Sequence, residues 1–371
     1  MTSRLSAKGP HRILALDGGG IRGTISLGYL ARIEQILRDR LGRENLVLAD
    51  YFDLIGGTST GAIIAACLAM GKSVDEIRRM YLELGGEVFA RKRWDLWNAR
   101  FDEKPLVRQL TKVFGDLRLG DPALRTGLCI IAKRADTGST WPLLNHPDGQ
   151  FYDANKSILL RQALRASSAA PTFFTPVQID LGDGQSGAFI DGGVSMANNP
   201  SMQLLLVATL KGFAFRWPVG ADNLLLVSIG TGHRKQKYDA VKMARSNVLT
   251  WASQVPRQLI EDASWQNQLL LQYLSRSLTP WPIDLEVGDL GEDLLGAEPL
   301  LTYLRYDVSL EGDVLASLGL DDLAGRAEQL FDMAAAENRL DLDRIGQAAA
   351  GQIVPEHFPR AFDSLSQESR A

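Results

Sequence analysis

Two glycine-rich turns, each between a short apolar run and a helical pattern, most constrain what this chain can fold into. The first, Asp17-Gly-Gly-Gly-Ile-Arg-Gly23, follows the apolar run at 12–16. The second, Gly57-Thr-Ser-Thr-Gly61, follows 51–55 and precedes a small apolar helix expected at 62–70. Successive strand, turn and helix units of this kind predict parallel strands joined by helices.

The rest of the chain continues this alternation. Apolar runs predict strands at 127–132, 141–144, 188–190 and 224–229, and helices fit 158–166, 202–210, 255–274 and 324–336. We therefore expect an α/β fold with a mainly parallel central sheet, helices on both faces and a helical C-terminal extension. No linker rich in Pro, Gly or Ser divides the sequence, so one domain with an extension is the economical interpretation.

Composition excludes several functional classes. With 40 basic and 44 acidic side chains, the formal net charge is −4, which gives no general reason to bind DNA or RNA. The two cysteines lie in apolar runs, and no pair of the four histidines has metal-ligand spacing, so we expect no metal and no cofactor. The first residues lack the apolar region of a signal peptide, which predicts a cytoplasmic protein.

The second turn matches G-x-S-x-G, the sharp strand-to-helix turn that exposes a nucleophilic serine. Ser59 is therefore the candidate nucleophile, with a helix N-terminus directed at the negative charge that develops on the attacked carbonyl. A serine hydroxyl needs a base, and a histidine–acid triad would use His146, His233 or His357. The sequence excludes none of the three.

The first turn has two competing interpretations. It contains G-x-G-x-x-G, the dinucleotide fingerprint, with Asp50 as a ribose ligand at a longer than usual spacing. A nucleotide-binding module using 18–23 is therefore one hypothesis. In the other, the N–H groups of Gly18, Gly19 and Gly20 form an oxyanion hole beside the serine, and Arg22 adds positive charge.

A third glycine motif, Asp191-Gly-Gly193, follows the apolar residues 187–190. This places Asp191 at the carboxyl end of an expected strand, where α/β sheets bind their ligands. An aspartate can replace histidine as a base only if it contacts the serine hydroxyl and partial desolvation raises its pKa.

Taken in order, these three motifs resemble the patatin-like phospholipase family. The resemblance runs from about residue 12 to 199 and includes Ser167-Ser-Ala-Ala-Pro171, and 303–307 resembles a late strand of many members. It implies a three-layer α/β/α fold and a Ser–Asp dyad in which Ser59 attacks an ester, Asp191 takes its proton, and Gly18 to Gly20 hold the oxyanion. On this basis the domains are a catalytic core at 10–232, a mainly helical part at 233–362 and a polar tail at 363–371.

The resemblance also implies a substrate and partners. The expected reaction is hydrolysis of fatty-acyl esters of membrane glycerolipids through an acyl-enzyme, with peripheral contact at the bilayer surface. Some bacterial relatives are antiviral effectors activated by cyclic nucleotides, which makes such an activator a hypothesis here. Homo-oligomerisation stays open. Residues 90–101, with Arg91, Trp94 and Trp97, have the basic and aromatic composition of an interfacial segment or lid, or of a surface helix with inward aromatics.

Overall fold

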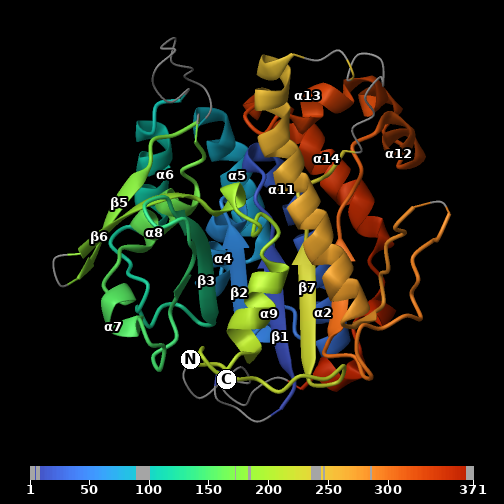
Figure 1. Cartoon of the computed structure of the whole chain (residues 1–371). Coiled ribbons are helices and arrows are strands. Elements are labelled where there is room, and N and C mark those ends of the chain that lie inside the picture. The colour runs from blue at the N-terminus through green and yellow to red at the C-terminus, as the bar shows by residue number, and fades with distance from the viewer. Residues whose placement is uncertain are drawn as a thin grey trace.

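The described strands of the computed structural model form one nine-stranded mixed sheet (Figure 1). The model describes residues 5, 9–88, 101–171, 173–182, 185–234, 244, 247–284 and 286–364. The strands are β1 (His11–Leu16), β2 (Leu54–Thr58), β3 (Gly127–Arg134), β4 (Thr140–Leu144), β5 (Val177–Gly182), β6 (Gln185–Asp191), β7 (Leu224–Ile229), β8 (Arg276–Ser277) and β9 (Thr302–Tyr306). Their order is β5-β6-β3-β2-β1-β7-β9-β8, and β4 pairs with β3.

Most strand pairs are parallel, and helices connect them. The pairs β1–β2, β1–β7, β2–β3, β7–β9 and β8–β9 are parallel, whereas β4, β5 and β6 are joined by antiparallel pairs. The helices are α2 (Gly23–Leu41), α3 (Leu48–Tyr51), α4 (Thr60–Ala69), α5 (Val74–Val88), α6 (Lys104–Phe114), α7 (Tyr152–Asn155), α8 (Leu160–Ser167), α9 (Ser201–Thr209), α11 (Val248–Tyr273), α12 (Gly312–Ser317), α13 (Ala327–Phe331) and α14 (Arg339–Ala349).

Alternate residues of the central strands enter two separate apolar cores, one on each face of the sheet. In β1, Leu14 and Leu16 pack with residues of α2, α4, α8 and α14, while Ile13 and Ala15 pack with residues of α9 and α11. Side chains alternate across a strand, so a strand that enters a core on both faces has consecutive apolar residues, as 13–16 do in β1. The predicted three-layer α/β/α fold with a mainly parallel sheet is confirmed.

The C-terminal part packs directly on the rest of the chain. Helix α14 crosses α2 where two glycines meet, because a Cβ on Gly28 would lie 2.3 Å from the Gly346 carbonyl carbon. The Asp343 carboxylate accepts two hydrogen bonds of 2.5 Å from Arg78. This part also contributes β9 to the sheet, next to β7, in the place where the resemblance indicated a late strand. The boundary at residue 232 therefore stays a prediction, and the parts on its two sides pack directly against each other.

Several sequence expectations need correction or fall outside the described residues. The apolar residues at 46–48 lead into the short helix α3, and the next strand begins at Leu54, not at Tyr51. The helix expected at 324–336 is broken into α13 and flanking 3-10 turns. The interfacial segment at 90–101 lies outside the described residues except for Phe101, which is buried and stacks on Phe173. Most of the predicted polar tail, 365–371, also lies outside them.

Candidate active site

Ser59 occupies a strained turn between β2 and α4. Its φ of 55° is in the region that residues with a side chain rarely adopt, and its ψ is −122°. The turn is this tight because its flanking residues are glycines: a Cβ on Gly57 would lie 2.3 Å from the Gly61 carbonyl carbon, and one on Gly61 would lie 2.2 Å from the Leu16 carbonyl oxygen. The predicted strand, turn and helix are confirmed, and Ser59 lies at a partly exposed position on the cavity wall.

A second serine holds this turn in place. The Ser59 N–H donates to Ser167 Oγ at 2.9 Å, and the Ser167 hydroxyl donates to the Ile131 carbonyl at 2.6 Å. Ser167 is fully buried at the end of α8. Sequence reasoning noted the 167–171 segment only as part of a resemblance, because nothing in the sequence pairs Ser167 with a residue 108 positions earlier.

Register in the sheet brings Asp191 to Ser59. Thr58, the last residue of β2, pairs with Ile131, and the next residue of β3, Ala132, pairs with Asp191, the last residue of β6. On its other edge β3 pairs with β4 at both of these positions, so β2 and β6 share one edge. These two strands therefore meet end to end, because β6 runs antiparallel to β3. Asp191 lies at the carboxyl end of its strand, as the sequence predicted. It reaches Ser59 because β6 runs antiparallel to β3, and not because β6 is one of the parallel strands.

Burial dominates the electrostatics of Asp191, which is 5% exposed. Burial raises the pKa of this carboxyl group to about 6, although hydrogen bonds from the Gly193 N–H and the Ser59 side chain lower it. The Gly193 N–H donates to Asp191 Oδ1 at 2.7 Å. No charged neighbour among the described residues contributes to this pKa. The carboxyl group can therefore both hold and release a proton near neutral pH.

The glycine loop between β1 and α2 offers fewer free donors than the sequence predicted. The Gly18 N–H donates to the Asn198 carbonyl at 3.0 Å, so this donor is already engaged, and the oxyanion role of Gly18 stays a prediction. Gly18 is also closely packed, since a Cβ there would lie 2.6 Å from Asn198 Oδ1. The N–H groups of Gly19 and Gly20 have no acceptor among the described residues. Asn198 carried no sequence signal of its own.

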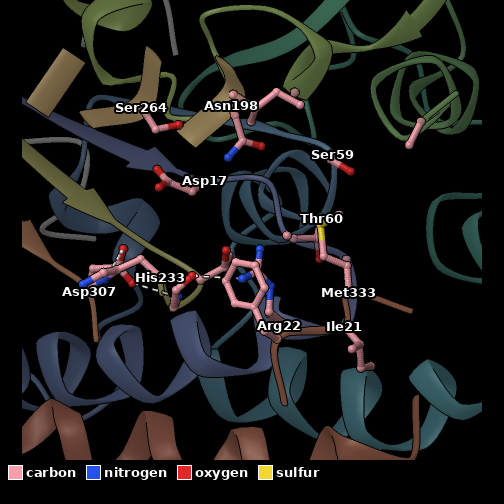
Figure 2. Close-up of a pocket in the computed structure, with 18 of the residues that line it drawn as sticks. Asp17, Ile21, Arg22, Ser59, Thr60, Asn198, His233, Ser264, Asp307 and Met333 are labelled. Atoms are coloured by element: carbon pink, nitrogen blue, oxygen red, sulfur yellow. Dashed lines mark hydrogen bonds and ion pairs between the residues drawn. The ribbon is translucent and has the colours of Figure 1, made fainter. Parts of the chain in front are cut away.

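Arg22 turns away from the serine along the same wall. Its Nη1 donates to the Gly232 carbonyl at 3.1 Å, and its guanidinium carbon lies 4.1 Å from the centroid of the Phe331 ring. Burial lowers the pKa of Arg22 to about 10, so the side chain stays protonated at neutral pH. Figure 2 shows Arg22 between Ser59 and the pair formed by His233 and Asp307.

A cavity of about 1620 Å³ joins these groups, and its wall has two sides. One side is apolar and is built by α4, α5, α6 and the loop before β5. Its residues include Ile63, Ile77, Met80, Leu106, Leu110, Val113, Phe114, Phe173 and Phe174. The other side is polar, with residues from the loops after β1, β7 and β9, from α11 and from the region of α13. An apolar channel that opens next to a serine and a carboxylate suits an acyl chain whose ester reaches Ser59.

A buried ion-pair cluster forms the floor of the polar side. Arg305 of β9 donates to both carboxylate oxygens of Asp17, at 3.0 and 2.7 Å, and to Asp307 at 3.0 Å. Burial lowers the pKa of Arg305, but these two carboxylates more than offset that effect and hold it above its ordinary value. Burial likewise raises the pKa of Asp307, but the His233 side chain and Arg305 outweigh it and lower the value to about 2.

The histidine and nucleotide alternatives find little geometric support. His233 lines the cavity with Nδ1 3.5 Å from Asp307 Oδ2, but no hydrogen bond joins Ser59 to a histidine among the described residues. His146 accepts a hydrogen bond from the Asp148 N–H, and His357 bonds the Tyr306 hydroxyl; neither lines the cavity. The expected ribose ligand, Asp50, forms an ion pair with Arg125 and also lies outside the cavity wall.

No group of three or more His, Cys, Asp or Glu side chains in the described part of the chain is arranged to hold a metal ion. None of the helices traced in it is both long and apolar enough to cross a bilayer.

Comparisons with known proteins cover both Ser59 and Asp191. Residues 14–205 match the model of the family described as patatin-like phospholipase. The chain is 30% identical to "Patatin-like protein 2" of Oryza sativa subsp. japonica, over 96% of this chain and 93% of the rice protein. It is 29% identical to "Patatin-like protein 1" of Arabidopsis thaliana, over 90% of this chain and 80% of that protein. It is also 34% identical to the "cGAMP-activated phospholipase" of Vibrio cholerae, over 60% of this chain and 65% of that relative.

Proposed function

The chain belongs to the patatin-like phospholipase family, whose members are lipid acyl hydrolases, and from that premise we propose that it cleaves fatty-acyl esters of membrane glycerolipids with a Ser59–Asp191 dyad. The observation that carries the proposal is the end-to-end meeting of β2 and β6, which puts a strained serine against a buried carboxylate. The apolar side of the cavity supports a long acyl chain as the group that is bound.

The proposed reaction has two steps. Asp191 accepts the proton of the Ser59 hydroxyl as Oγ attacks the ester carbonyl, and the N–H groups of Gly19 and Gly20 stabilise the resulting oxyanion. The C–O bond to the alcohol then breaks, and Asp191 returns the proton to the departing alkoxide. In the second step Asp191 takes a proton from water, the hydroxide attacks the acyl-enzyme, and the fatty acid leaves as Ser59 regains its proton.

Regulation by a nucleotide is a second part of the proposal. It is supported by the Vibrio cholerae relative, whose printed name is cGAMP-activated phospholipase, and this chain spans just under two thirds of that relative. The proposed regulation rests on sequence similarity alone. Its test is to measure fatty-acid release by the full chain with and without cGAMP. If cGAMP does not change the release, the proposed regulation is wrong and the proposed hydrolysis is unaffected.

The test of the hydrolase itself uses Ser59. We expect a fluorophosphonate probe to label the full chain covalently, the Ser59→Ala variant to escape labelling, and Ser168→Ala to label normally. Ser168 is the matched control because it is another serine on the cavity wall. The same proteins are then given phospholipid vesicles, and released fatty acids are measured by mass spectrometry. Release by Ser59→Ala at the wild-type rate would overturn the mechanism.

A further inference from the structure

Four successive backbone carbonyls between β6 and α9 each accept a hydrogen bond from a distant part of the chain. The segment 196–199 is a turn outside the strands and helices, so regular structure does not use these carbonyls. Loop carbonyls can be satisfied by water, but all four of these have a protein donor. They belong to Met196, Ala197, Asn198 and Asn199.

The two middle carbonyls of this segment hold two parts of the candidate active site. The Ala197 carbonyl accepts from the Thr58 hydroxyl at 2.5 Å, and Thr58 directly precedes Ser59. The Asn198 carbonyl accepts from the Gly18 N–H at 3.0 Å, at the start of the glycine loop. Consecutive residues of a chain have Cα atoms about 3.8 Å apart. These two hydrogen bonds therefore fix the serine turn against the glycine loop.

The same segment packs against the turn that follows the candidate base. A Cβ on Gly193 would lie 2.8 Å from Asn198 Oδ1, and the Gly193 N–H is the donor to Asp191 Oδ1. Asn198 lines the cavity, and Figure 2 shows its side chain on the wall together with Ser59. The nucleophile, the candidate base and the glycine loop therefore all have the segment 196–199 as a common neighbour.

The outer two carbonyls of the segment are held by one side chain of the C-terminal part. Asn267 of α11 donates through Nδ2 to the Met196 carbonyl at 2.6 Å and to the Asn199 carbonyl at 3.2 Å. An amide nitrogen carries two hydrogens, which matches its two acceptors here. Asn267 is 8% exposed, and α11 packs on the same face of the sheet as α9 (Figure 1). One buried side chain thus holds the segment at both ends.

We propose that Asn267 is a positioning residue for the reaction at Ser59. It acts through the segment 196–199, which keeps the serine turn and the glycine loop at the separation that oxyanion stabilisation requires. A displacement of about 1 Å in such an arrangement can lower a rate about a hundredfold. The inference rests on the proposed hydrolysis with Ser59 as the nucleophile. It also makes α11 part of the catalytic unit, across the boundary expected at residue 232.

The experiment compares two buried amides of the same helix. Gln272 of α11 also donates through its side-chain nitrogen to two loop carbonyls, of Trp281 at 3.1 Å and of Asp289 at 2.9 Å, and it is 4% exposed. Asn267→Ala and Gln272→Ala therefore remove the same kind of contact, and urea denaturation measures the stability that each loses. Gln272→Ala is the matched control because its acceptors are outside the segment 196–199.

The measured quantity is the hydrolysis of the soluble ester p-nitrophenyl butyrate by the full chain. Asn267→Ala is expected to lower kcat by about tenfold to a hundredfold, with KM within about twofold of the wild-type value. Gln272→Ala is expected to keep kcat within about twofold. The rate at which a fluorophosphonate labels Ser59 should fall with kcat in Asn267→Ala only. An equal loss of kcat in the two variants would overturn the proposal, because the effect would then belong to α11 in general.

A second variant tests the route through the segment. Thr58→Val keeps the side-chain shape, removes the donor to the Ala197 carbonyl, and is expected to lower kcat about tenfold. Because Thr58 and Asn267 hold one segment, the double variant should lose less kcat than the product of the two single losses. Losses that multiply, or an unchanged kcat in either single variant, would overturn the positioning role. Hydrolysis that does not depend on Ser59 would instead overturn the proposed function, so the two failures are distinguishable.

Discussion

Asp17 and Asp191 are two buried carboxylates at the carboxyl ends of two strands of one sheet. Asp17 directly follows β1 and Asp191 ends β6, both line the cavity, and they are 4% and 5% exposed. Asp17 receives two hydrogen bonds from the Arg305 guanidinium, whereas Asp191 is near no cation in the described chain. Burial raises the pKa of both carboxyl groups to about 6, and the Arg305 guanidinium acts against this effect at Asp17. What distinguishes Asp191 as the proposed base is the hydrogen bond that it accepts from the Ser59 side chain.

The largest expected effect of this difference is on activity. We expect Asp191→Asn to lower kcat/KM for a soluble ester by about 10⁴-fold, the upper range for loss of a general base. The amide keeps an oxygen for the Gly193 N–H but cannot take the serine proton. Steady-state kinetics measure this kcat/KM. The control is Asp153→Asn, an exchange at an exposed carboxylate. Its kcat/KM should stay within about twofold of the wild-type value, because surface substitutions usually have small effects. Near wild-type activity in Asp191→Asn would mean that another residue acts as the general base.

The next largest effect is on stability at the other carboxylate. Arg305→Met leaves Asp17 and Asp307 buried without their cation, which should cost at least about 3 kcal/mol of unfolding free energy. Urea denaturation measures this cost. The control is Arg344→Met, because the ion pair of Arg344 with Asp322 is exposed and should contribute less than about 1 kcal/mol. Equal costs for the two exchanges would mean that the cluster of Arg305 does not hold this end of the sheet together.

The sequence predicted the parts of this site that depend on local chemistry. Gly57 and Gly61 flank a strand-to-helix turn that only glycines can form. The apolar run at 224–229 became β7 with the same bounds. Each of these features is determined within a few residues of the chain.

What the sequence could not predict depends on register and on distant pairs. The Asp17–Arg305 pair joins residues 288 positions apart, and no local pattern relates them. The antiparallel direction of β6 decides that Asp191 reaches Ser59, yet strand direction is a property of the assembled sheet. The hydrogen bond from the Gly18 N–H to the Asn198 carbonyl likewise depends on how two loops pack against each other.

A smaller effect concerns the stability of the wild type against pH. The folded pKa of Asp191, about 6, is above the ordinary value of 3.8, so its ionisation destabilises the folded state. This penalty is fully present above pH 6 and absent below about pH 4, and a shift of about two pKa units corresponds to about 3 kcal/mol. Asp191→Asn should therefore unfold at higher urea concentration than the wild type at pH 8 and at a similar concentration at pH 4. A gain of equal size at both values would contradict the argument.

The smallest effect is the acid limb of the rate profile, and it separates the carboxylate from the histidine alternative. Asp191 must be ionised to accept the Ser59 proton, so kcat/KM for a soluble ester should be nearly constant above pH 7 and fall as pH drops through about 6. At pH 5 the value should be about tenfold below the plateau, since one unit below its pKa only a tenth of the base is ionised. The position of this limb should be the same in His233→Gln, because the ring pairs with Asp307 and not with the serine. A limb that disappears in His233→Gln would assign the base to the histidine, and Asp191 would then be a structural carboxylate like Asp17.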